Sequence, residues 1–162
     1  MKKLIFLFAF CVSGILGETV FAQVTLRVNI ASQPIWGPVG YDHAEYYYLP
    51  DIETYYYVPG HKYIYLENGR WISRSYLPQR YNNYDVYSSR KIVINDRKPY
   101  LRHQEYKTKY AVSNERSNQQ SIRDSHDSRY FANKNHPEHS KWKENKGNQG
   151  RNQNQENGRR PN

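Results

Sequence analysis

The pattern of hydrophobic and polar positions divides the chain into three parts. Residues 4–16 are almost wholly apolar, residues 24–112 alternate short apolar and aromatic runs with turn residues, and apolar residues nearly vanish after that. The middle part has the period-two alternation and the proline and glycine punctuation of short strands. We therefore expect a small β-rich domain over residues 23–111, between a leader (1–22) and a tail (112–162).

Several segments of the middle part match strand signatures. Residues 24–30 alternate apolar and polar positions without a break, and residues 46–50 and 55–59 form two similar tyrosine-rich units that each end in proline. Residues 91–95 favour a further strand because β-branched residues dominate there. Residues 33–41 contain two prolines and two glycines, which exclude regular structure, so we expect a packed loop.

Residues 62–73 predict a β-hairpin, because Asn68 and Gly69 tolerate the positive φ angles of a type I′ turn. The resulting register joins opposite charges and apolar side chains across the strands: Glu67 with Arg70, Leu66 with Trp71, and Tyr65 with Ile72. One set of side chains should point to the core, namely Ile64, Leu66 and Trp71. Two tyrosines should point to the opposite face, namely Tyr63 and Tyr65.

Residues 99–110 predict one helix, since Pro99 suits a first turn and aromatic side chains recur at helical spacing. The expected fold is mainly β: one small antiparallel meander sheet with a short covering helix, followed by a disordered C-terminal tail. The tail is basic, rich in Asn and Gln, and poor in the apolar residues that offset ordering entropy. Within it, residues 122–131 combine charges with an aromatic pair. They either dock on the domain or order only on a partner.

The N-terminus has the form of a cleavable export signal. Lys2 and Lys3 precede the apolar run, which is shorter than the roughly 20 residues of a membrane span. We expect cleavage near Ala22-Gln23, a periplasmic or secreted location, and no transmembrane span in the mature chain; an uncleaved anchor is the alternative. The only cysteine, Cys11, lies in the leader. The mature chain therefore cannot form a disulfide or a thiolate metal site.

Charge and tyrosine content indicate the kind of partner to expect. The chain has a net charge of +9 and 17 tyrosines. Positive charge favours anionic surfaces, although it also keeps a secreted protein soluble. Because tyrosine triplets place rings on both faces of a strand, we expect one face to bind sugars, peptides or another copy through exposed tyrosines. The binding residues predicted on this basis are Tyr47, Tyr56, Tyr63 and Tyr65. The alternative is that tyrosine covers both sides of a thin sheet.

Two other sets of residues have relevant chemistry. His136 and His139 have ligand-like spacing, which predicts weak divalent-metal binding at most. Asp51 and Glu53 would lie on one strand face and act as a hydrolase pair only at a suitable separation. Because the chain has no nucleophile motif and no phosphate-binding glycine loop, we predict a non-enzymatic protein without a cofactor. Aromatic and basic residues would also suit nucleic acid, but export argues against a dedicated role of that kind.

Three strings of the domain are distinctive: WGPVGY at 36–41, YYYLPDIE at 46–53 and YIYLENGRW at 63–71. They resemble small tyrosine-rich exported proteins of Gram-negative bacteria that have no assigned function, over about residues 24–110. The resemblance implies export and transfers no site residues. The leading hypothesis is a non-enzymatic envelope binding or structural module that uses exposed tyrosines and the basic tail, with an envelope protein or polysaccharide as its partner. A weak divalent-metal-binding protein and a carboxylate-based hydrolase are the alternatives.

Overall fold

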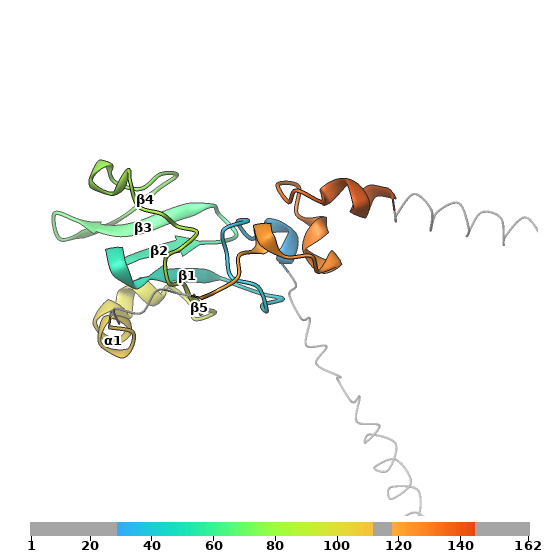
Figure 1. The fold of residues 1–162 in the computed structure, drawn as a ribbon. Coiled ribbons are helices and arrows are strands. Elements are labelled where there is room, and N and C mark those ends of the chain that lie inside the picture. The colour runs from blue at the N-terminus through green and yellow to red at the C-terminus, as the bar shows by residue number, and fades with distance from the viewer. Residues whose placement is uncertain (1–28, 112–117, 145–162) are drawn as a thin grey trace, which may run out of the picture.

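The computed structural model describes residues 29–111 and 118–144, and its centre is one five-stranded antiparallel sheet (Figure 1). The strands are β1 (Tyr46–Leu49), β2 (Thr54–Tyr57), β3 (Lys62–Glu67), β4 (Arg70–Arg74) and β5 (Ile92–Ile94). The predicted mainly β fold is thereby confirmed. The leader expected at 1–22 and most of the strand expected at 24–30 lie outside the described residues. Ile30, the last residue of that expected strand, begins a 3₁₀ turn instead.

The order of the sheet is β4-β3-β2-β1-β5, so the last strand does not continue the meander. After β4, residues 75–91 carry the chain to the opposite edge, where β5 pairs antiparallel with β1. Val93 lies beside Tyr47 in this register, and Ile94 lies beside Tyr46. The apolar side chains of β5 therefore extend the packing on both faces of the tyrosine-rich strand β1.

The β3–β4 hairpin has the predicted register, from Glu67 opposite Arg70 to Tyr63 opposite Arg74. Asn68 and Gly69 have φ angles of 49° and 73°, as a type I′ turn requires. Burial differs from the prediction: Leu66 is 46% exposed, whereas Tyr65 is 3% exposed. β2 stops pairing with β3 at Ile64, so the hairpin extends beyond β2, and Leu66 has a strand beside it only on the β4 side.

Helical turns connect and cover the sheet. The helix α1 (His103–Lys109) continues the 3₁₀ turn η4 (Pro99–Arg102), so the predicted covering helix is confirmed with a tighter first turn. Residues 139–144 are also α-helical. The other 3₁₀ turns are η1 (Ile30–Ser32), η2 (Pro50–Ile52), η3 (Gln79–Tyr81), η5 (Ile122–Asp124) and η6 (Ser128–Ala132). In the part of the chain that the structure describes, no helix combines the length and apolar character needed to cross a membrane.

Both faces of the sheet are covered. The η4–α1 segment closes one face through a cluster made up of Tyr46, Tyr48, Tyr55, Ile64, Ile94 and Tyr106. On the other face, the Trp36 loop and the connection before β5 close a cluster made up of Trp36, Ala44, Tyr47, Leu49, Ile52, Tyr56 and Val58. Neighbouring residues of β1 and β2 enter opposite clusters, as the two-residue repeat of a strand dictates. Tyrosine therefore forms the core on both sides.

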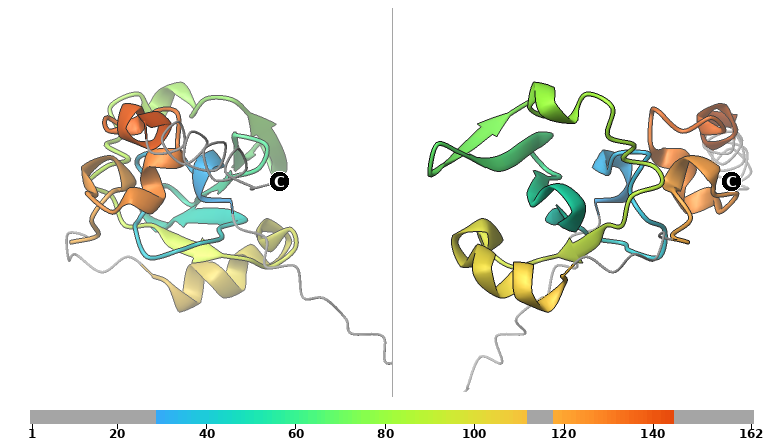
Figure 2. Two further views of the ribbon diagram at one scale, coloured as in Figure 1. Left: turned by 90° about the vertical axis from the view of Figure 1, so that its right-hand side faces the viewer. Right: turned by 60° about the vertical axis from the view of Figure 1, so that its left-hand side comes forward.

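Residues 118–144 pack at the end of the sheet away from the β3–β4 turn, against the loop before β1 (Figure 2). Ile122 is fully buried there with Ile30 and Tyr130. Three backbone hydrogen bonds cross this seam, from Val39 to Gln120, from Ile122 to Gly37, and from Arg123 to Ile35. Residues 122–131 therefore dock on the domain, and the packed body extends past the boundary predicted at residue 112. Residues 112–117 and 145–162 lie outside the described part of the chain.

Candidate functional site

The tyrosines predicted to form an exposed binding surface are not exposed. Tyr47 has no exposed surface, Tyr56 and Tyr65 are buried, and Tyr63 is half-buried. The physical reason is the double cover of the sheet. The Trp36 ring alone lies 5.5 Å from that of Tyr47, 4.9 Å from that of Tyr56 and 6.5 Å from that of Tyr63. The prediction of a tyrosine face is wrong, and tyrosine instead covers both sides of the sheet.

The buried tyrosine hydroxyls are occupied by hydrogen bonds within the domain. Tyr47 donates to Gln33 Oε1 at 2.8 Å, and the Tyr56 hydroxyl lies 3.2 Å from His61 Nδ1. Burial raises the pKa of Tyr56 to about 12, and the pKa of Tyr47 rises for the same reason. These phenols stay protonated at neutral pH. A protonated, hydrogen-bonded and enclosed phenol is suited to packing rather than to nucleophilic chemistry.

Asp51 and Glu53 do not share a strand face. Pro50 ends β1 and begins η2, which places Asp51 inside a 3₁₀ turn and Glu53 at its end with a left-handed φ of 47°. Asp51 accepts a hydrogen bond of 3.2 Å from the Tyr84 hydroxyl. The expectation of one extended strand face for both carboxylates is therefore wrong, because the proline replaces the strand with a turn.

Glu53 joins the β1–β2 turn to α1. Lys107 Nζ lies 2.6 Å from Glu53 Oε1, and His103 Nε2 donates to Oε2 at 3.2 Å. The Tyr55 hydroxyl lies 3.1 Å from His103 Nδ1, so the chain of contacts ends in the core. The hydrogen bond from Lys107, supported by that from His103, holds the pKa of Glu53 below its usual value. Glu53 is thus an ionised carboxylate held between two side chains of the helix.

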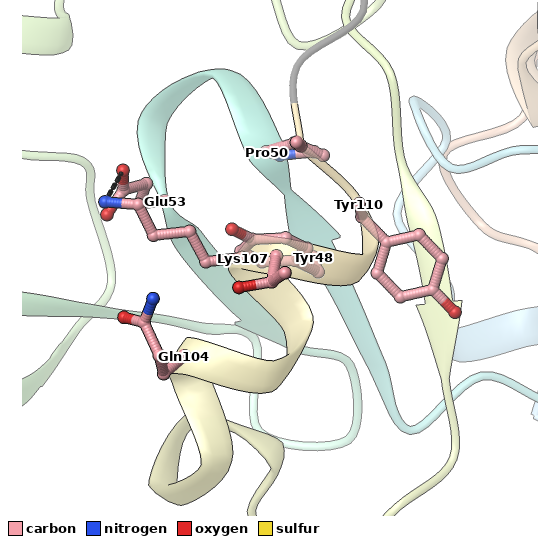
Figure 3. Close-up of a pocket in the computed structure, with 8 residues that line it drawn as sticks. Tyr48, Pro50, Glu53, Gln104, Lys107 and Tyr110 are labelled. Atoms are coloured by element: carbon pink, nitrogen blue, oxygen red, sulfur yellow. Dashed lines mark ion pairs between the residues drawn. The ribbon is translucent and has the colours of Figure 1, made fainter.

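Two pockets border this ion pair. One of 290 Å³ runs from Glu53 and Lys107 to Tyr110 (Figure 3). The other, of 280 Å³, lies at the overhanging end of the hairpin, where Asp51, Leu66 and Arg80 contribute to its wall. Both of the carboxylates considered for hydrolysis thus border a pocket. Each is already engaged with the fold, so the arrangement fits a clamp between turn and helix better than an acid–base pair.

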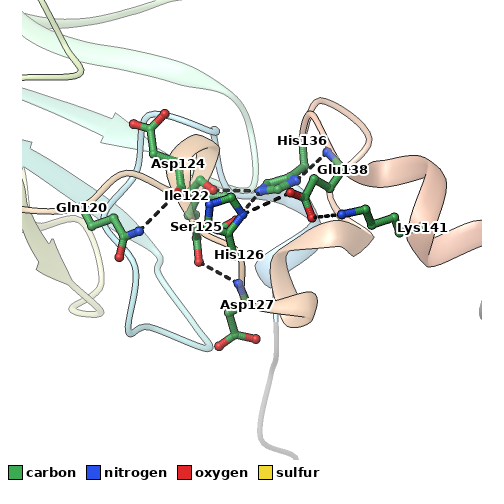
Figure 4. Close-up of polar contacts among 9 residues, drawn as sticks. All are labelled: Gln120, Ile122, Asp124, Ser125, His126, Asp127, His136, Glu138 and Lys141. Carbon is green, nitrogen blue, oxygen red and sulfur yellow. Dashed lines mark hydrogen bonds and ion pairs between the residues drawn. The ribbon is translucent and has the colours of Figure 1, made fainter.

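His136 and His139 make contacts that fix the C-terminal segment, and Figure 4 shows those of His136. The Nε2 atom of His136 lies 3.0 Å from Ile122 O and 3.1 Å from Ser125 O, and its Nδ1 accepts from the Glu138 N–H at 3.0 Å. Because carbonyl oxygens only accept, Nε2 carries the proton. The Nδ1 of His139 donates to Phe131 O at 2.7 Å.

The predicted histidine metal site does not form in this arrangement, since a metal ion would have to replace the contacts of His136 to backbone groups. Over residues 29–111 and 118–144, no group of three or more His, Cys, Asp or Glu side chains could hold a metal ion. Glu138 instead bridges His126 and Lys141, at 3.1 Å and 2.9 Å. These contacts hold residues 136–141 against the 122–126 turn.

A pocket of 500 Å³ lies at the seam between the loop before β1 and residues 132–135. Trp36, Tyr56 and His61 form part of its wall. Its amide groups are used by the fold: Gln33 accepts from Tyr47, and Asn133 donates to Gln33 O at 2.5 Å. The pocket therefore lies where the loop before β1 packs against residues 132–135.

A basic surface that the sequence did not reveal lies on the β3–β4 hairpin and the segment that follows it, and we call it the basic edge. It consists of three arginines and two exposed apolar side chains: Arg70, Arg74, Arg80, Leu66 and Tyr76. Among the described residues, none of these guanidinium groups has a carboxylate oxygen within 4.0 Å. Tyr76 is 65% exposed, and β4 is an edge strand. Sequence could not separate these arginines from the others, because pairing depends on which carboxylates the fold brings near.

Comparison with protein-family models, with curated proteins and with solved structures finds no match to this chain. Its function is therefore argued from its own geometry.

Proposed function

We propose that this chain is an exported, non-enzymatic binding module of the cell envelope that takes an anionic partner on the basic edge. The observation that supports the proposal is the grouping of three arginines without ion-pair partners among the described residues, beside exposed Leu66 and Tyr76. Arginine and tyrosine are the side chains most enriched at the centres of protein interfaces. Positive charge grouped on β4 and the segment after it also attracts anions before contact.

Three paired arginines provide a contrast. Arg102 lies 2.6 Å from Asp96, Arg123 lies 2.8 Å from Asp124, and Arg129 lies 2.9 Å from Asp42. The fold thus neutralises these three locally. Arg90 and Arg97, elsewhere in the described chain, also have no carboxylate oxygen within 4.0 Å, so the basic edge is distinguished by the grouping of its arginines and not by the lack of partners alone. The charge of the basic edge is left for an external group, and its effect should weaken as salt screens it.

We propose a non-enzymatic protein because the carboxylate and phenol groups that could react already make contacts within the fold. Glu53 is paired with Lys107 and accepts a hydrogen bond from His103, and the core tyrosines are protonated and enclosed. Export is carried by the leader predicted at residues 1–22, and the mature protein is taken to begin at Gln23. An intact Met1 on the native protein, detected by mass spectrometry, would remove the export part of the proposal.

The binding part is tested with the mature chain and two triple variants of equal net charge. One changes Arg70, Arg74 and Arg80 to Ser, and the matched control changes the paired arginines 102, 123 and 129 to Ser. We expect the first to lose about tenfold or more in affinity for dextran sulfate at low salt, and the control to lose much less. Equal losses would mean that total charge alone governs binding, which would contradict a site on the basic edge.

A further inference from the structure

The two edges of the sheet are treated differently by the fold. Next to β5, the side chain of Gln119 accepts from Lys91 N at 2.9 Å and donates to Lys91 O at 2.8 Å. One amide therefore occupies both backbone groups, as a paired strand would. At the other edge, no segment within residues 29–111 or 118–144 pairs with the outer side of β4.

The register of the hairpin determines which backbone groups β4 turns outward. In a two-residue hairpin the closing pair exchanges backbone hydrogen bonds, and bonded pairs then alternate along the strands. Here the closing pair is Glu67 with Arg70. The N–H and C=O groups of Trp71 and Ser73 therefore point away from β3, to the open side of the sheet.

The side chains of β4 give this edge a pattern. Arg70, Ile72 and Arg74 lie on one face, because residues two apart in a strand share a face. Both arginines are exposed, and the isoleucine between them is half-buried. Glu67 lies opposite Arg70, on the β3 side. In the described part of the chain neither side chain makes an ion pair within 4.0 Å, so the guanidinium group of Arg70 is available to a strand on its other side.

We propose that β4 accepts an extended acidic polypeptide segment as a sixth strand of the sheet, an inference that rests on the proposed function and names its partner class. Addition of a strand to an exposed edge uses backbone hydrogen bonds for affinity and alternate side chains for specificity. Opposite Arg70, Ile72 and Arg74, the best partner has an acidic residue, an apolar residue and an acidic residue at alternate positions. The partner segment is thus acidic–x–apolar–x–acidic.

The same charges disfavour the pairing of β4 with a second copy that is centred on Ile72. Antiparallel pairing of two β4 strands about Ile72 would place Arg70 of each copy opposite Arg74 of the other. Like charges in directly opposed positions destabilise a strand pair. The basic edge thus disfavours this self-pairing and favours a strand of opposite charge, which agrees with the way natural proteins protect sheet edges.

Ser73 offers a variant that separates strand addition from charge attraction. Ser73→Pro removes an N–H that points outward, so it keeps the pairing with β3 and the charge of the edge. Ser73→Ala is the matched control because it retains the N–H. The probe is a short synthetic peptide of Thr, Glu and Val with the acidic–x–apolar–x–acidic pattern, used with the mature chain, and urea melts confirm that each variant is folded.

We expect the peptide to bind the parent chain and Ser73→Ala alike and to lose about tenfold in affinity for Ser73→Pro. Hydrogen exchange should slow at the amides of Trp71 and Ser73 when the peptide binds. N-methylation of the peptide at the positions facing β4 should cause a similar loss of affinity at unchanged charge.

The failures are distinguishable. Equal affinities for Ser73→Pro and Ser73→Ala, or no binding of the peptide while dextran sulfate or vesicles of anionic phospholipid bind through the three arginines, would overturn strand addition and leave the proposed function standing. If the triple arginine variant binds dextran sulfate as its matched control does, the proposed function fails and strand addition on this charged edge fails with it.

Discussion

The hydroxyl of Tyr47 donates a hydrogen bond of 2.8 Å to the side-chain oxygen of Gln33, and both side chains are buried. The amide nitrogen of Gln33 in turn donates to Asn29 Oδ1 and to Tyr41 O, at 3.2 Å and 3.1 Å. One glutamine thus fastens the loop before β1 to the centre of the sheet. A network of this kind is costly to break, because a buried polar atom without a partner keeps its desolvation penalty.

Tyr47→Phe should therefore destabilise the protein although it keeps the aromatic ring. Removing the hydroxyl leaves Gln33 Oε1 buried without its donor, and we expect the free energy of unfolding to fall by about 1 to 3 kcal/mol. Tyr76→Phe is the control, because Tyr76 is exposed and the same change should have almost no effect. Urea denaturation at pH 7 measures both. Equal stabilities of the two variants would mean that the Tyr47–Gln33 bond carries no net stability.

Substitutions at two glycines should distinguish the cost of backbone strain from the cost of a steric clash. Gly69 has a φ of 73° and open space where a Cβ would lie, so Gly69→Ala should cost about 1 kcal/mol through strain alone. A Cβ on Gly37 would lie 2.6 Å from the Tyr47 hydroxyl oxygen, so Gly37→Ala must displace a core ring and should cost more. Asn68→Gly should be nearly neutral. Thermal melts that rank Gly69→Ala as the more harmful change would contradict this packing.

Local features were readable from the sequence because their causes are local. The register of the β3–β4 hairpin follows from the Asn68–Gly69 turn, and β1 ends directly before Pro50. The same reasoning placed Leu66 in the core and Tyr65 outside it, which is wrong. Their burial depends on how far β2 extends beside β3, and no residue within the hairpin encodes that length.

Long-range features were missed for the complementary reason. β5 reaches β1 across the whole sheet, and this depends on which edge leaves apolar side chains uncovered. The average composition of the C-terminal part is polar, and this concealed the docking of residues 118–144. The apolar contact depends on single residues such as Ile122 and Tyr130, which are both buried at the seam. His136 was misread as a ligand because spacing alone does not reveal that its ring nitrogens contact backbone groups.

Ile122→Ala tests whether the C-terminal segment belongs to the packed body. Ile122 is fully buried, so its truncation should lower the free energy of unfolding by about 2 to 4 kcal/mol. A residue in a solvated tail would show no effect, and exposed Leu101→Ala, as the control, should change stability by less than about 0.5 kcal/mol. Urea denaturation gives the comparison. Equal results for the two variants would contradict the seam.

Lys91 should make the stability of the protein depend on pH in an unusual direction. The side chain is 1% exposed, and its Nζ donates to Tyr87 O and Ser89 O at 2.9 Å and 2.8 Å. Burial lowers the pKa of Lys91 to about 8, against the attraction of Asp85 and Asp51. An unfolded lysine titrates near about 10.4. Between these values the unfolded chain binds more protons than the native one, so stability rises with pH.

The core tyrosines act in the opposite direction at higher pH. Burial raises the pKa of Tyr48 and Tyr56 to about 12, whereas an unfolded tyrosine loses its proton near about 10, so stability falls as pH passes through that range. Burial raises the pKa of further tyrosines as well, so we expect the free energy of unfolding to rise by about 1 kcal/mol from about pH 8 to about pH 9 and then to decline. Lys91→Met should abolish the rise and keep the decline, because the lowered pKa of Lys91 causes the rise and the raised pKa values of the tyrosines cause the decline. Urea denaturation at intervals from pH 7 to pH 11 tests both statements, and a rise that persists in Lys91→Met would assign the effect to another group.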